Sequence, residues 1–118
     1  MKYLCLIYDE ESKLDAMTPA EAAAFMGDYR ALSQSLRESG AYLGGEALQP
    51  IASATTVRVR GGKMSTTDGP FAETKEQLGG FYLVEAKSQD EAIQIAARIP
   101  SAKTGSIEVR PILDLSGK

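Results

Sequence analysis

GGFYLVEAKSQDEAIQIAARIP, at residues 79–100, decides the fold, because it combines a buried strand with a capped helix. Residues 81–84 are apolar at successive positions, as in a strand with both faces covered. Ser88 and Glu91 form the ends of a capping-box pattern that starts a helix, and Pro100 stops it. The helix places Ala92, Ile95, Ala96 and Ile99 on one face. The stretch predicts a helix that packs on a sheet.

The same unit occurs at the start of the chain. Residues 2–8 are apolar and end at an acidic run, which favours a short buried strand. Thr18 and Glu21 form a second capping box, with Pro19 at the first helical position. A helix is therefore predicted over residues 19–39, ending at Gly40. Its apolar face comprises Ala22, Phe25, Met26, Tyr29, Leu32 and Leu36.

Two further strands separate these units, and another ends the chain. Residues 55–60 alternate apolar and basic side chains, and Gly61-Gly62 can turn the chain back into a hairpin. Residues 107–113 also alternate, and Pro111 suggests an edge position or a strand end. Together these elements predict one α+β domain over residues 1–118: a ferredoxin-like antiparallel sheet with two helices on one face and an extra hairpin.

The second face of this sheet also needs cover, because residues 2–8 and 81–84 are apolar on both sides. A second copy packed sheet against sheet would give a two-fold homodimer, a dimeric α/β barrel, with a pocket between the sheets or at their rim. The alternative is a curled sheet that its own hairpin covers. We expect the homodimer.

The composition excludes several kinds of chemistry. The chain has no histidine and only one cysteine, Cys5, which lies in an apolar run and is expected to be a buried thiol. The usual zinc ligand sets, serine–histidine and cysteine–histidine catalysis and haem ligation by histidine are therefore excluded. The glycine motifs of nucleotide-binding loops are missing too. We expect no metal and no cofactor.

Charge and hydropathy exclude further classes of partner. The formal charge is -3, acidic and basic residues are interspersed, and Arg58 and Arg60 are too few to neutralise a run of phosphates. We expect no nucleic-acid partner. The chain has no apolar run long enough to span a bilayer and no leader pattern, so no membrane association and a cytoplasmic location are expected.

The segment DGPFAETKE at residues 68–76 resembles the DGPF-motif branch of the YCII-related family. Matching segments also occur at residues 2–8, 45–50, 77–82 and 108–111, so the resemblance covers nearly the whole chain. It implies a dimeric ferredoxin-like α/β barrel with an active site in a cleft. Some members pair an aspartate with a histidine; Asp68 matches the aspartate, but no residue here can supply the histidine. The resemblance implies no established reaction, only suspected enzyme activity and an association with sigma factors of the extracytoplasmic class.

Asp68 is the candidate general acid or base. Desolvation in an apolar cleft would raise its pKa and fit it for that role without histidine. Alternatively, an aspartate before Gly-Pro accepts backbone hydrogen bonds in a turn. Gly69 and Pro70 would fix this turn in either case.

The other candidate substrate contacts are Glu46, Phe71, Glu73 and Lys75. Glu46 follows two glycines and could meet Asp68 from a neighbouring strand as a paired carboxylate. Phe71 is expected in the core, or stacked on a ligand ring. Glu73 and Lys75 belong to a charged cluster that is ordinarily solvated, although Lys75 could contact an anion. Arg58 and Arg110 are expected to face outward.

Three functions remain open. The first is a small-molecule enzyme acting on a carbonyl or carboxylate compound, with Asp68 as acid/base and Glu46 or Lys75 orienting the substrate. The second is a ligand-binding or regulatory module, with a sigma factor as the partner that the resemblance implies. The third is a structural protein in which the loop of residues 68–76 only closes the sheet.

Overall fold

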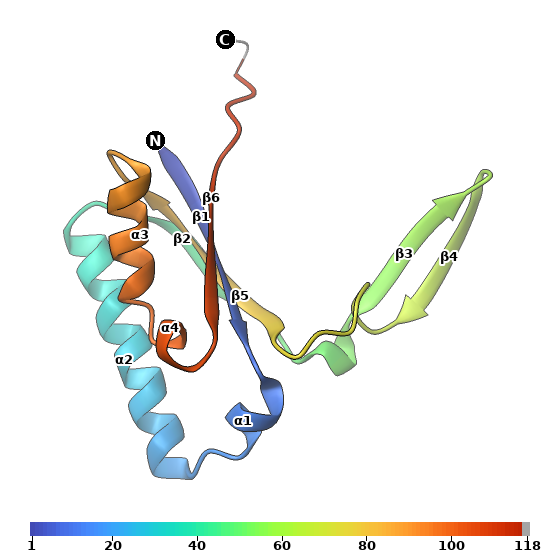
Figure 1. Cartoon of the computed structure of the whole chain (residues 1–118), viewed down its shortest axis with the longest axis horizontal. Coiled ribbons are helices and arrows are strands. Elements are labelled where there is room, and N and C mark those ends of the chain that lie inside the picture. Colours follow the sequence, from blue (N-terminus) through green and yellow to red (C-terminus); the bar gives the residue numbers. More distant parts are fainter. Residues whose placement is uncertain (117–118) are drawn as a thin grey trace.

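The computed structural model describes residues 1–116 and has a four-stranded sheet, a separate two-stranded sheet and short and long helices (Figure 1). None of the helices in these residues combines the length and apolar character needed to cross a membrane. In chain order the elements are β1 (Lys2–Asp9), α1 (Glu11–Asp15), α2 (Pro19–Glu38), β2 (Tyr42–Ala47), η1 (Ile51–Ser53), β3 (Thr55–Arg60), β4 (Lys63–Asp68), β5 (Gln77–Glu85), α3 (Gln89–Ala97), α4 (Ser101–Thr104) and β6 (Ser106–Pro111).

The main sheet is antiparallel and has the strand order β2-β5-β1-β6. Both long helices, α2 and α3, cover the same face of this sheet (Figure 1). Leaving out the hairpin, the chain thus runs strand, helix, two strands, helix, strand, with the first strand in the interior of the sheet. The predicted ferredoxin-like α+β fold is confirmed.

The helix termini follow the predicted caps. The Thr18 hydroxyl accepts the backbone N–H of Glu21, and the Glu21 carboxylate accepts the N–H of Thr18. The Ser88 hydroxyl likewise accepts the N–H of Glu91. The chain leaves α2 at Gly40, whose φ of 80° is accessible to glycine at little cost.

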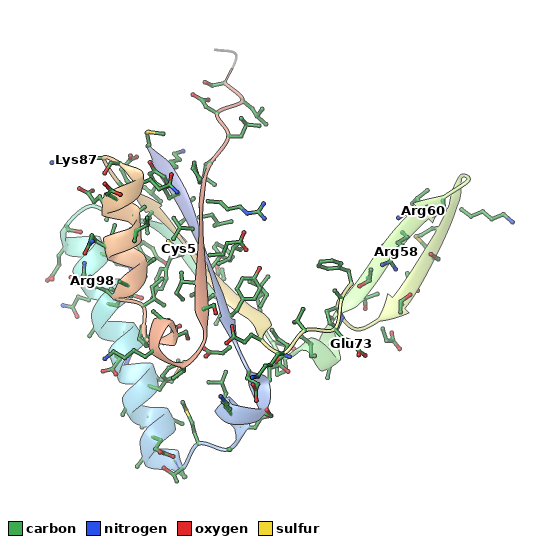
Figure 2. The ribbon with its side chains drawn as sticks, in the orientation of Figure 1. Cys5, Arg58, Arg60, Glu73, Lys87 and Arg98 are labelled. Carbon is green, nitrogen blue, oxygen red and sulfur yellow. The ribbon has the colours of Figure 1, made fainter. Side chains whose placement is uncertain are left out.

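The core lies between the main sheet and its two helices. Alternate residues of β1 and β5 point into it and meet Leu36 of α2 and Ile99, which follows α3. Cys5 is completely buried, as predicted, and Figure 2 shows it between the helices and the sheet. Burial raises the pKa of its thiol to about 11, so this sulfur is a neutral core atom.

The opposite face of the main sheet has no helix over it, and we call it the open face. The strand register aligns Leu4 with Leu83 and Leu6 with Phe81 on this face, and all four side chains are partly exposed. Across β1 they are flanked by Arg110 and Glu108, whose side chains form an ion pair with a 2.6 Å N···O distance. The open face is therefore an apolar strip with a charged edge.

Strands β3 and β4 form the predicted hairpin, with Gly61 and Gly62 both at positive φ in its turn. The hairpin does not pair with the main sheet and projects away from it, as Figure 1 shows. We call it the arm (residues 55–68). The arm therefore does not cover the open face of its own chain. The alternative prediction, a curled sheet covered by its own hairpin, is wrong for the single chain.

Candidate functional site

A cavity of about 780 Å³ lies between residues 25–37 of α2, the short helix α1 and the adjoining ends of β1, β2 and β5. Its apolar lining includes Leu14, Phe25, Met26 and Leu48. Met26, which the helical pattern assigned to the packed face, is half exposed because this part of α2 borders the cavity and not the sheet. An apolar concavity with a few polar groups is the usual form of a small-molecule site.

A buried carboxylate lies in the lining of this cavity. Asp9 ends β1 on the helix-covered face and is only 6% exposed. Its Oδ1 atom accepts a hydrogen bond of 2.7 Å from the Thr104 hydroxyl. The next residue, Gly105, passes so close to β1 that a Cβ atom there would lie 2.0 Å from the Tyr8 carbonyl oxygen. Glycine at position 105 therefore permits the approach that supplies the Asp9 carboxylate with its partner.

Three tyrosines line the same cavity, and two of them, Tyr29 and Tyr82, are hydrogen-bonded to serines. The rings of Tyr29 and Tyr82 stack at 6.4 Å between centroids with an interplanar angle of 16°. The Tyr29 hydroxyl shares a hydrogen bond with Ser101, and the Tyr82 hydroxyl shares one of 2.6 Å with Ser33. Burial raises the pKa of both tyrosines, and the serine hydrogen bonds oppose this only in part. Both phenols are therefore neutral near pH 7.

Two cations of α2 also line the cavity. Arg30 and Arg37 both line it, and the Arg37 guanidinium carbon lies 4.3 Å from the centre of the Tyr42 ring. A cation held over an aromatic face keeps a defined position while its N–H groups remain available. This part of the cavity suits an anionic group.

The short helix α1 is fastened to the rim of the cavity by Glu11. Its carboxylate accepts the backbone N–H of Ile51 at 3.0 Å, and its own N–H donates to the Gln77 side-chain oxygen at 2.9 Å. These bonds join α1 to η1 and β5, segments that lie far apart in the sequence. These hydrogen bonds therefore hold the rim of the cavity in a defined conformation.

Glu46 is the one predicted site residue that lines the cavity. It lies in β2 opposite Phe81, so the register directs it to the open face, and both residues line the cavity. Asp68, the last residue of β4, is exposed and lies outside the lining. A single chain therefore does not bring the two predicted carboxylates together around this cavity.

The turn after Asp68 is held by other groups. The N–H of Gly69 donates to the Ala54 carbonyl at 2.7 Å, and the Thr56 hydroxyl donates to the Gly69 carbonyl at 2.8 Å. Gly69 has a φ of 101°, as the predicted turn requires. In residues 1–116 no side-chain hydrogen bond fastens Asp68 to this turn.

Residues 69–76 connect the arm to β5, and none of the candidates Pro70, Phe71, Glu73 and Lys75 lines the cavity. Phe71 is 81% exposed, so its predicted core position is wrong: the segment runs outside both sheets, and no element packs over it. Glu73 and Lys75 are exposed, and Figure 2 shows Glu73 near the base of the arm.

Sequence reasoning missed the interior of the cavity. The contact between Asp9 and Thr104 spans 95 positions, which no local pattern encodes. One signal was present, because Asp9 continues the inward alternation of Cys5 and Ile7 and so places a carboxylate on a core face. Among the residues that the structure describes, no group of three or more Asp, Glu, Cys or His side chains could hold a metal ion.

Comparisons with known proteins agree on the family. The family model of the YCII-related domain matches residues 1–116. An uncharacterized protein of Rhizobium meliloti (strain 1021) is 41% identical over 114 residues, which cover 95% of this chain and 92% of that protein.

Among solved structures, 5-chloro-2-hydroxyhydroquinone dehydrochlorinase of Burkholderia phenoliruptrix AC1100, in complex with 2,5-dihydroxybenzoquinone, matches with a TM-score of 0.48 and 18% identity. The match covers 96% of this chain and 94% of that one. By the match of the family model over residues 1–116, this chain belongs to the YCII-related family.

Proposed function

We propose that this YCII-related protein, as a member of the DGPF branch, is an enzyme that binds a small carbonyl or carboxylate compound and acts on it with carboxylate acid/base chemistry. The observation that carries the proposal is the buried Asp9 carboxylate in a largely apolar cavity of about 780 Å³. A carboxylate in an apolar cavity, beside neutral hydrogen-bond donors, can bind and orient a polar substrate group. The phenols of Tyr29 and Tyr82 are such donors.

The cavity suggests a role for each of its sides. Arg30 and Arg37 would bind an anionic group of the substrate, and the phenols would donate hydrogen bonds to a carbonyl oxygen. Asp9, held by Thr104, would orient the substrate from the interior. Glu46, which also lines the cavity, would contact it from β2.

Asp68 is proposed as the general acid or base, with Phe71, Glu73 and Lys75 as substrate contacts and Gly69-Pro70 as the turn that presents them. In a single chain Asp68 is exposed and outside the cavity. The role therefore requires that the arm and cavity of different copies meet in a homodimer.

The alternative is a ligand-binding or regulatory module without catalysis, with a sigma factor as its possible partner. The position of Asp68 outside the cavity favours this function, because a single chain could bind a ligand in the cavity without any contact to Asp68. The two functions differ in whether the ligand is consumed.

A ligand screen followed by turnover assays tests the proposal. Small carboxylates and carbonyl compounds would be screened by thermal shift with the unmodified protein, and each hit would be tested for chemical conversion. We expect Arg30→Gln to weaken binding and Asp68→Asn to abolish conversion with binding retained. Asp28→Asn, at an exposed position of α2 outside the cavity lining, is the control and should change neither.

Each outcome has a distinct meaning. Binding without conversion would favour the regulatory module. Conversion by Asp68→Asn at the unmodified rate would remove Asp68 from the mechanism, and binding that Arg30→Gln leaves unchanged would move the anion site elsewhere.

A further inference from the structure

The arm is amphipathic. The register pairs Val57 with Thr66 and Val59 with Met64, which places these side chains on one face, whereas Arg58, Arg60 and Lys63 lie on the other. Figure 2 shows Arg58 and Arg60 along the arm. The apolar face is bare in the single chain: Val57, Val59 and Met64 are 57%, 60% and 71% exposed.

A bare arm of this kind needs a partner. An isolated two-stranded ribbon is at best marginally stable in water, and an exposed row of β-branched and sulfur side chains on it is typical of an interface. Within residues 1–116 the arm pairs with no other strand, and it projects away from the main sheet (Figure 1). Cover for its apolar face must therefore come from outside the part of the chain that the structure describes.

The chain itself carries a surface of the matching kind. On the open face Leu4, Leu6, Phe81 and Leu83 form an apolar strip that no helix of the chain covers. Two copies related by a two-fold axis can therefore cover both surfaces at once, because each supplies one arm and one open face. Such an arrangement is a closed dimer in which neither apolar surface is exposed to water.

Charge also favours a second copy over an unrelated partner. The arm carries three cations and one carboxylate, Asp68, whereas the rest of the chain has ten Lys and Arg against 15 Asp and Glu. The arm of one copy is thus attracted to the acidic body of another.

We propose that two copies exchange arms, so that the apolar face of each arm lies on the open face of the other copy. Asp68 shares the apolar face of the arm with Val57 and Val59. The exchange would therefore carry Asp68 of one copy onto the face where Glu46 of the other lines its cavity. The placement of Asp68 in the site rests on the function proposed above; the exchange itself does not.

Complementary charges across the proposed contact provide the test. Val59→Glu places a negative charge on the apolar face of the arm. Leu83→Lys and Leu83→Glu place a positive and a negative charge, respectively, on the open face. Mixed copies of Val59→Glu and Leu83→Lys would have one unmodified contact and one with opposite charges. Mixed copies of Val59→Glu and Leu83→Glu would have like charges in that contact. Ser65→Glu adds the same charge on the polar face of the arm and is the control.

Analytical ultracentrifugation is the readout, with circular dichroism to verify that each variant is folded. We expect dimers for the unmodified protein and Ser65→Glu, and monomers for each of the other variants alone. The mixture with Leu83→Lys should associate about tenfold more tightly than the mixture with Leu83→Glu. Equal association of the two mixtures, or a monomeric unmodified protein, would overturn the exchange. Because no ligand is involved, this result is independent of whether the protein is an enzyme.

Discussion

The Thr104 hydroxyl donates a hydrogen bond of 2.7 Å to the carboxylate of Asp9 and so joins the end of α4 to the end of β1. Asp9 is buried, and a buried carboxylate that loses its hydrogen-bond partner is costly. This hydrogen bond therefore stabilises the fold and also fixes the shape of the cavity.

Thr104→Val should therefore lower the free energy of unfolding by about 1–3 kcal/mol, because the carboxylate loses its donor while the side chain keeps its volume. Urea unfolding at a fixed protomer concentration measures this. Thr104→Ser retains the hydroxyl and should lose much less. Equal losses in the two variants would show that the hydrogen bond contributes little.

Gly105→Ala should destabilise the protein more strongly. The added Cβ atom would meet the Tyr8 carbonyl oxygen at 2.0 Å and the Asp9 carboxylate at 2.7 Å, so the backbone must shift. We expect a loss of ~3 kcal/mol or more in urea unfolding.

The matched control for Gly105 is Gly27→Ala, inside α2. A Cβ atom there meets only the end of the Arg30 side chain, at 3.9 Å. Alanine favours the helix over glycine, so this variant should gain up to about 1 kcal/mol. A stable Gly105→Ala protein would contradict the close approach of α4 to β1.

The burial of the Cys5 thiol should make the free energy of unfolding depend on pH. Burial raises the pKa of Cys5 from 9.0 to about 11, so the folded state holds this proton more tightly than the unfolded state. Its contribution is complete below about pH 9 and is lost as the pH rises through about 11. The free energy of unfolding should fall over this range, and less steeply in Cys5→Ala. Because burial raises the pKa of Tyr29 and Tyr82 too, some fall should remain in the variant.

The same thiol should react slowly with a thiol reagent at pH 8 in the folded protein and rapidly in urea. The thiolate is the reactive form, and burial both suppresses it and blocks access. Fast labelling of the folded protein would mean that this part of the sheet opens readily.

Most of the fold was predictable because its signals are local. Thr18 and Glu21 lie three positions apart and fix the start of α2, and Gly61-Gly62 alone indicate the turn of the arm. The direction of the arm was not predictable, since it depends on how residues 50–54 and 69–76 leave the main sheet. Phe71 was placed wrongly for this reason: its exposure follows from that path and not from its neighbours in sequence.

The site was harder to predict than the fold. Glu46 was found because two glycines precede it, and it does line the cavity. Asp9, Tyr29 and Ser101 come together only through packing between distant elements, and each resembles an ordinary core or cap residue in the sequence. The conspicuous loop of residues 68–76 drew attention to Asp68, which lies outside the cavity of its own chain.

Replacing Asp68 with asparagine should leave the stability unchanged within ~0.5 kcal/mol, or raise it, because the turn that follows is held by Thr56 and by the backbone of Gly69. Thr56→Val removes one of these bonds and should cost ~1 kcal/mol. Both variants would be compared in urea at the same protomer concentration, since dimerisation shifts apparent stability. A larger loss for Asp68→Asn than for Thr56→Val would make Asp68 a residue of the turn. The expected order means that the carboxylate contributes nothing to the loop that carries it, which is the pattern of a group kept for function.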